Sequence, residues 1–355
     1  MSLIDRLWRL PGSGGFLAEI EGLRFFGVLP VVLDRAWWTY RANVRDPGFA
    51  LEPQLGRVFP ASEMGVQIFF VISGYVLGLG FFRAARDARD VGLGRDFFRR
   101  LCRLQPPFIF IMTIFFALLL TIGRLGVFEG LEHYLASITC LHGLIYLEPS
   151  PINTVTGSLE VELEFYVFAP ALYAIYRLEP RLAYAIIAGG MLLFVATAHL
   201  LGDFYLTLLS HGHLFLLGAA FPILSRFKIP ARLTFVLLAA PLPLFMIEAD
   251  YSSVCGNLAK IALLSAVFAM TLGCAPVRRS LSLPFLSEVG GAFYSIYLIH
   301  YSLLSPSSKV WAKTALPGGL SVSLALTLLC VLVVGMAFYI IAQRAFMSRS
   351  AKKIA

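Results

Sequence analysis

Long apolar runs recur along almost the whole chain, from residue 22 to residue 342, with short polar joints between them. Each run has about 17 to 25 residues, the length that an α-helix needs to cross a bilayer core of about 30 Å. Lipid offers the backbone no hydrogen-bond partners, so runs of this kind cross as helices. Hydrophobic residues make up 58% of the 355 residues and charged residues only 14%, which excludes a water-soluble globular domain. The sequence therefore predicts an all-α integral membrane protein.

The basic joints between the runs predict the topology. They all fall on one side of the membrane only if the amphipathic run 131–148 lies on the outer face instead of crossing. We therefore expect a bundle of about ten transmembrane helices, with both termini cytoplasmic and one extra non-spanning outer helix. The chain then divides into a cytoplasmic N-terminal segment (1–21), a transmembrane domain (22–342) and a basic cytoplasmic tail (343–355). The predicted spans are 22–38, 61–82, 104–122, 158–176, 182–201, 205–225, 232–248, 254–273, 288–307 and 318–342.

Charged residues lie at both ends of the first predicted span, EIEGLRFFGVLPVVLDRAWW (19–38). Arg24 and Arg35 are eleven residues apart, so they share a helix face at a separation of roughly 16 Å. Arg24 either reaches back to the inner surface or serves a function inside the bundle. Asp34 and Arg35, where lipid should begin, are a catalytic feature, an ion pair at the membrane edge, or the remnant of a lost activity.

A second concentration of charge lies between Arg83 and Arg103, which holds seven arginines and three aspartates. Guanidinium groups bind phosphate in a two-pronged geometry, so this stretch suits a polyanionic ligand. The alternative is an orientation signal that also contacts anionic membrane lipid. The net charge of +8 arises in such joints and not on one soluble face, so we expect no nucleic-acid partner.

Carboxylates and histidines inside predicted spans are the remaining candidates for chemistry. GSLEVELEFYVFAP (157–170) is expected to be a helix with Glu160 and Glu164 on one face and Glu162 nearly opposite. His211, His213 and His300 also lie in spans, but no pair has the spacing or the acidic partner of a metal site. We therefore expect no metal.

The order of the motifs resembles the membrane-bound acyltransferase-3 family across nearly the full chain. The motifs are EIEGLR, GVQIFFVISGY, FFRRLCRLQPP, SLEVELEFY, LFLLG and FYSIYLIHYSLL. The resemblance implies about ten spans and transfer of an acetyl-like acyl group from cytoplasmic acyl-CoA to a carbohydrate or lipid-linked glycan. It implies no permanently bound cofactor, and a location in the bacterial inner membrane as part of cell-envelope polysaccharide modification.

Several residues match the family motifs at the inner side. Arg24 matches the family's arginine after Gly-Leu, and Ser73 matches its FFxxSG segment. Arg100 and Arg103 match its cytoplasmic RxxR, which implies that they hold the phosphates of coenzyme A. We expect the neighbouring Arg99 to contribute to the same site.

Further matches lie toward the outer side. Ser158 and Glu162 match the family's WSLxxE, although its tryptophan is Gly157 here and its second acid is Leu163. Tyr297 and His300 match its SxYLxH.

The opening stretch departs from the family pattern. The family places a histidine, its usual candidate for the general base, eleven residues after the first-span arginine, and Arg35 occupies that position. Arginine keeps its proton and cannot remove one from a sugar hydroxyl. Asp34, Glu162 or His300 would then be the base, and Arg35 would orient a carboxylate or stabilise an oxyanion.

Three hypotheses follow from the sequence. The first is an O-acyltransferase with a different base, and the second is a catalytically altered member that acts as a non-enzymatic membrane or glycan-binding partner. The third is a small-solute transporter, which explains neither the arginine-rich stretch nor the motif order.

Overall fold

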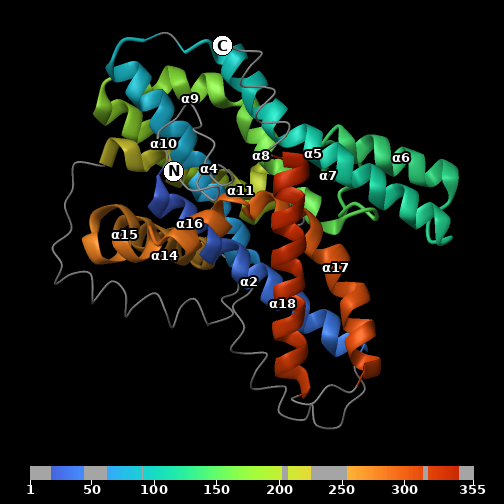
Figure 1. Cartoon of the computed structure of the whole chain (residues 1–355). Coiled ribbons are helices and arrows are strands. Elements are labelled where there is room, and N and C mark those ends of the chain that lie inside the picture. The colour runs from blue at the N-terminus through green and yellow to red at the C-terminus, as the bar shows by residue number, and fades with distance from the viewer. Residues whose placement is uncertain are drawn as a thin grey trace.

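The computed structural model describes residues 17–43, 62–89, 91–201, 207–224, 254–314 and 319–343. All secondary structure in these residues is helical (Figure 1), which confirms the all-α prediction for this part of the chain. The first half contains α2 (Ala18–Asn43), α4 (Ser62–Arg86), α5 (Leu93–Thr121), α6 (Val127–Ile138), α7 (His142–Tyr146), η2 (Thr154–Thr156), α8 (Gly157–Val167) and α9 (Ala169–Tyr176). The second half contains α10 (Pro180–Leu201), α11 (Leu208–Leu224), α14 (Val254–Gly273), α15 (Ala275–Leu281), α16 (Pro284–Gly291), α17 (Phe293–Thr314), α18 (Gly319–Phe338) and η3 (Tyr339–Gln343).

Five of the described helices are long and apolar enough to cross a membrane: Glu63–Arg86, Leu93–Thr121, Pro180–Leu200, Val254–Gly273 and Ala325–Gln343. The apolar helix α11 is shorter, and α2 carries charges near both ends. The predicted span 232–248 lies outside the described residues. The membrane character of the chain is therefore supported, whereas the number of ten spans and the side of each terminus stay predictions.

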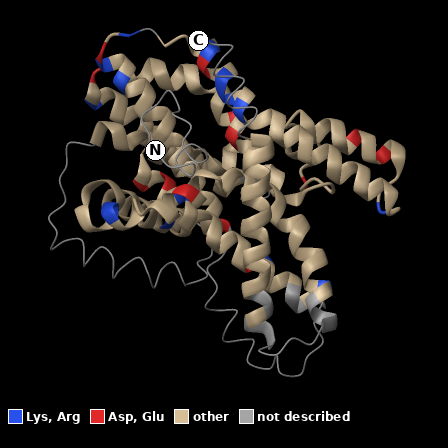
Figure 2. Cartoon of the chain, viewed as in Figure 1, with Lys and Arg blue, Asp and Glu red and all other residues tan. Residues whose placement is uncertain are grey.

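The arginine-rich turn between α4 and α5 defines one end of the molecule, and α6 with α7 defines the other. Basic residues gather where α4 ends and α5 begins, and acidic residues occur on α6 (Figure 2). Following the predicted topology, we call these the inner and the outer end.

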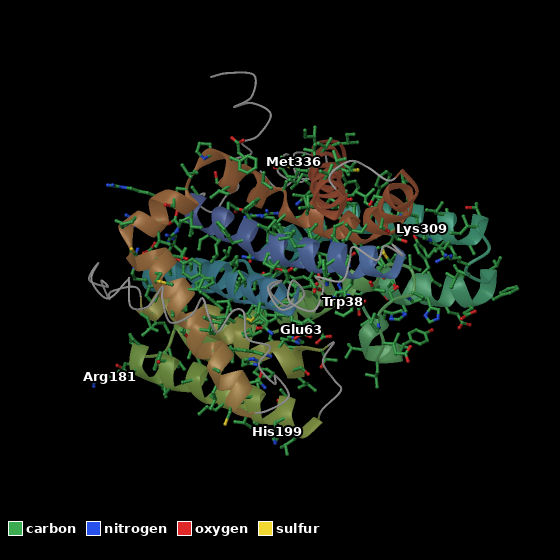
Figure 3. All side chains as sticks on the ribbon, turned by 90° about the horizontal axis from the view of Figure 1, so that it is seen from below. Trp38, Glu63, Arg181, His199, Lys309 and Met336 are labelled. Carbon is green, nitrogen blue, oxygen red and sulfur yellow. The ribbon has the colours of Figure 1, made fainter. Side chains whose placement is uncertain are left out.

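The pair α2 and α4 lies at the centre of the bundle. The two helices run antiparallel, because Gly27 meets Gly65 while Glu19 lies within electrostatic range of Tyr75. α2 also packs against α16 and α17, and α4 packs against α11 and α9. At the edge of the bundle Arg181 and His199 lie at opposite ends of α10, and Lys309 lies on α17 (Figure 3).

The crossing of α4 and α11 requires two glycines. A Cβ atom at Gly74 would lie 2.0 Å from the backbone oxygen of Phe215, and one at Gly218 would lie 2.0 Å from that of Val71. Small residues let helix backbones approach closely in membranes, where packing supplies most of the attraction between helices. Around this crossing Phe215, Phe70 and Phe165 form the centre of the largest core, with ring centroids 4.7 Å and 4.3 Å from that of Phe215.

The structure corrects several predicted boundaries. Helix α5 begins at Leu93, before the predicted start at residue 104, and contains Pro106 and Pro107 in its interior. Its early start is stabilised by an ion pair between Asp96 and Arg100, one helical turn apart. The predicted single span 158–176 is broken at Phe168 into α8 and α9, because Pro170 cannot donate a backbone hydrogen bond and would clash with the carbonyl of Tyr166 in a continuous helix.

Two further boundaries differ in the same way. The predicted outer helix within 131–148 is two helices, α6 and α7, joined by a turn at Cys140 with a positive φ of 56°. The last predicted spans begin with the short helix α16 and end in the π-helical turn η3. Each difference is a local break that hydrophobic periodicity does not encode.

Replacing Gly74 by alanine is expected to lower the free energy of unfolding by about 1 to 3 kcal/mol, because the new methyl group overlaps the α11 backbone. Thermal unfolding of the detergent-purified protein measures the change. Gly80→Ala is the matched control in the same helix, since a Cβ there meets nothing within 4 Å. Equal stability of the two variants would contradict the close α4–α11 crossing.

Candidate functional site

One face of α8 carries three hydrogen-bonding side chains at intervals of four residues: Ser158, Glu162 and Tyr166. Residues four apart lie on the same helix face, and eight residues rise by about 12 Å, so these side chains form a line along the bundle. We call them the α8 polar stripe. Glu162 is its centre, because one carboxylate oxygen accepts hydrogen bonds from the Ser73 hydroxyl at 2.7 Å and from the Tyr166 hydroxyl at 2.5 Å.

The inner end of the stripe meets the arginine-rich part of α5. The guanidinium of Arg100 lies 5.4 Å from the centre of the Tyr166 ring, and its Nε donates to Asp96 at 2.9 Å. Arg103 lies within electrostatic range of Tyr166, and the side chains of Arg99 and Arg103 are exposed. A cavity of about 280 Å³ opens here, lined by Phe81, Leu93, Gly94, Asp96, Phe97, Arg100, Tyr166, Val167, Ala169 and Pro170.

Arg24 lies at the inner end of α2 and is not free to reach the surface. One of its terminal nitrogens donates to both carboxylate oxygens of Glu21, at 2.6 and 2.8 Å, and its guanidinium lies 5.1 Å from the centre of the Phe293 ring. Only 12% of its side chain is exposed. Arg103 lies within electrostatic range of both Arg24 and Glu21, so the ion pair of Arg24 with Glu21 has a second guanidinium group near it.

The outer end of the stripe meets α17. The hydroxyls of Ser158 and Tyr297 form a hydrogen bond of 2.8 Å. His300 is fully buried, and its Nδ1 donates to the carbonyl of Tyr297 at 2.7 Å. Its Nε2 has no partner among the described residues, and in this tautomer of the neutral ring Nε2 carries a lone pair. His300 is thus oriented as a hydrogen-bond acceptor or a base.

The pair at the end of the first span is not an ion pair. The described ion pairs are those of Arg24, Arg86, Arg89 and Arg100, and neither Asp34 nor Arg35 forms one within the described ranges. Arg35 is exposed and lies within electrostatic range of Tyr297 and His300, while Asp34 is partly buried. The structure therefore brings Arg35 to the outer end of the α8 polar stripe.

The other two glutamates of α8 hold neighbouring elements. Glu160 accepts a hydrogen bond from the backbone NH of Gly143 in α7 at 2.6 Å, and Glu164 accepts one from that of Leu208 at 2.7 Å. The predicted division of the three carboxylates between two faces agrees with these separate partners. One face of α8 thus carries the stripe, and the other ties α7 and α11 to it.

Sequence reasoning missed Tyr166 and Asp96 as members of this site. The signal was present for Tyr166, because it continues the spacing of four from Ser158 and Glu162. It was also present for Asp96, because an acid four residues before Arg100 favours a helical ion pair. No group of three His, Cys, Asp or Glu side chains that could hold a metal occurs within the described ranges.

The fold and the stripe define an all-helical membrane protein in which a line of polar side chains joins an arginine-rich inner end to an oriented histidine. The chain matches the family model described as an acyltransferase domain over residues 17–342, so it belongs to the acyltransferase-3 family. Neither a curated protein nor a solved structure matches it. Family membership supports acyl transfer in general and gives the transporter hypothesis no support.

Tyr166→Phe is expected to lower the free energy of unfolding by about 1 kcal/mol, because the partly buried Glu162 then loses one of its two described donors. Denaturant titration in detergent micelles measures the loss. Tyr184→Phe on the exposed face of α10 is the control and should leave stability unchanged. An unchanged stability of Tyr166→Phe would mean that its hydrogen bond to Glu162 does not form.

Proposed function

We propose that the chain transfers an acyl group from acyl-CoA to a hydroxyl of a cell-surface or exported carbohydrate, in the bacterial inner membrane. The observation that carries the proposal is the α8 polar stripe, whose two ends have different chemistry. Its inner end has guanidinium groups suited to an anionic donor, and its outer end has a histidine suited to accept a proton. A reaction between substrates from opposite sides of a membrane needs these two ends connected.

The donor would bind at the inner end. The phosphates of coenzyme A would bind to the guanidinium groups of Arg99, Arg100 and Arg103. Ser73 lies next to this binding site along the α8 polar stripe, where its hydroxyl donates a hydrogen bond to Glu162. Arg24 adds positive charge beside Arg103. The apolar wall of the inner cavity would receive the uncharged part of the donor.

His300 is the base that the geometry favours among the three candidates. Its Nδ1–H is held by a carbonyl, which leaves Nε2 as the acceptor, whereas Glu162 already accepts two hydrogen bonds. Asp34 has no described partner that would orient its carboxylate toward a substrate. Since His300 is fully buried, the helices that surround it must move for a sugar hydroxyl to reach it.

Residues of this chain can carry the proton and stabilise the negative charge at each step of the reaction. Nε2 of His300 takes the proton of the acceptor hydroxyl. At the same time the oxygen of that hydroxyl forms a bond to the carbonyl carbon of the thioester. Negative charge develops on the carbonyl oxygen, where Arg35 would stabilise it. The carbon–sulfur bond breaks, and the departing thiolate of coenzyme A receives the proton from His300. Arg35 thus acts on the oxyanion and does not replace the family's histidine as a base.

A catalytically altered member is the second candidate, and Arg35 is the observation that favours it. Arg35, which is exposed and forms no ion pair with the residues that the structure describes, stands at the position of the family's expected base. Such a protein would bind donor or glycan without transferring the acyl group.

Acetyl-CoA hydrolysis and acylation of envelope polysaccharide distinguish the two candidates. We expect His300→Gln to lower the hydrolysis rate by at least about 100-fold, the contribution of a general base. His199→Gln, at the end of α10, is the matched control and should retain the rate. Glu162→Gln and Asp34→Asn test the other two candidate bases in the same assay.

Two outcomes of these assays would contradict the proposal or its choice of base. If purified wild-type protein neither binds nor hydrolyses acyl-CoA, and deletion of the gene removes no acyl ester from any surface glycan, acyl transfer is wrong. If hydrolysis occurs but is insensitive to His300→Gln, the base is one of the two carboxylates.

A further inference from the structure

A polar pocket that the reaction above does not use lies at the outer end of the molecule. It is a cavity of about 400 Å³ between α6, α7 and the segment after α7, within the size range of small-molecule sites. Its lining residues are Glu129, His133, His142, Tyr146, Glu148, Pro149 and Pro151. We call it the outer pocket.

The outer pocket is tied to the α8 polar stripe through one hydrogen bond. The NH of Gly143, next to His142, donates to Glu160 on α8, two residues beyond Ser158. The α6–α7 arm is visible at the end of the molecule away from the α4–α5 turn (Figure 1). The pocket therefore lies on the acceptor side of the site proposed above.

A chain of hydrogen bonds fixes the two imidazoles. Nδ1 of His142 lies 3.1 Å from the carbonyl of Glu148 and must donate to it, so Nε2 of the neutral His142 ring is an acceptor. Nδ1 of His133 lies 2.9 Å from that Nε2 and donates to it. Burial lowers the pKa of His142 below its ordinary value of 6.5, which favours the neutral ring. Nε2 of a neutral His133 is then left with a lone pair.

The Tyr146 ring packs on both imidazoles, with centroids 4.6 Å from His133 and 4.7 Å from His142. The two imidazole centroids are 5.1 Å apart. These three mutually packed rings, tilted by 30° to 45° relative to one another, form a pre-arranged aromatic wall. Such a wall suits the apolar face of a sugar ring while neighbouring polar groups bind its hydroxyls.

The polar groups of the outer pocket are almost all acceptors. Glu129 and Glu148 are carboxylates, and Nε2 of His133 is an acceptor in the tautomer above. No lysine or arginine occurs among the lining residues. A ligand must therefore donate hydrogen bonds, and an anionic ligand would meet two carboxylates without a compensating cation.

We propose that the outer pocket binds a segment of the carbohydrate acceptor that carries no anionic group, namely an uncharged or amino-bearing sugar. This inference rests on the proposed function, because it assigns the acceptor class of the same reaction. The pocket would hold the acceptor chain at α7 while another of its sugars reaches the outer end of the stripe. Acceptors with carboxylate or phosphate groups at this segment would be excluded.

Binding of three oligosaccharides to the full-length purified protein tests the pocket: maltohexaose (uncharged), a glucosamine hexamer (cationic) and hexagalacturonate (anionic). Equilibrium dialysis is expected to give binding of the first two and none of the third. The double variant Glu129→Gln and Glu148→Gln should weaken binding of the glucosamine hexamer at least about tenfold, because it removes both carboxylates. Glu132→Gln on the same helix is the matched control, since Glu132 is exposed and does not line the pocket.

Three results would overturn the inference: binding of hexagalacturonate as tight as that of the other two, wild-type affinity in the double variant, or no binding of any hexamer. The thermal unfolding midpoint of each variant, compared with the wild type, shows whether it is folded. Acetyl-CoA hydrolysis by the same preparation separates the two proposals. Hydrolysis without pocket-dependent binding rejects the outer pocket alone, whereas pocket-dependent binding without any acyl-CoA binding or hydrolysis rejects the acyl transfer.

Discussion

The two hydrogen bonds that Glu162 accepts, from Ser73 and Tyr166, are the contacts on which the arrangement of the bundle depends. A carboxylate within a membrane protein is costly unless donors surround it, so α4 and α8 must come close enough to supply them. The glycines of α4 let it pack closely on α2 and α11, and in this position its Ser73 reaches Glu162. The inner arginines and the outer histidine then lie at the two ends of one helix. The hydrogen bonds that Glu162 requires, and not apolar packing alone, therefore set the positions of the groups proposed to react.

Hydrophobic run length predicted the helices well where nothing interrupts them. The span at 254–273 coincides with α14, and those at 182–201 and 205–225 differ from α10 and α11 by a few residues. The predictions were wrong where local chemistry overrides composition. Pro170 breaks the span after α8, and the Asp96–Arg100 pair extends α5 into a charged stretch that reads as a loop. The span at 232–248 lies outside the described residues.

The candidate site was predictable in its parts but not in its connections. Motif order selected Arg24, Ser73, Glu162 and His300, and periodicity separated Glu162 from the other glutamates of α8. No pattern indicated that Ser73 and Glu162, 89 residues apart, share a hydrogen bond. Nor did the sequence indicate that Asp34 and Arg35 do not form an ion pair. Opposite charges at neighbouring positions are compatible with an ion pair, and only the directions of the two side chains decide whether it forms. Long-range contacts of this kind depend on helix packing, which single-sequence patterns do not specify.

The spacing within α8 has a consequence for how the chain can vary. This helix has eleven residues, and each residue turns it by about 100°, so one residue inserted between Ser158 and Tyr166 would rotate half of the stripe away from its partners. The same insertion would turn Glu160 or Glu164 out of contact with α7 or α11. Ser158 and Tyr166 are separated by about 12 Å along α8, so this helix sets the distance between the contact with Tyr297 at one end and the contact with Arg100 at the other. An insertion in α8 would therefore change the site directly, because this one short helix sets the distance between Arg100 and His300.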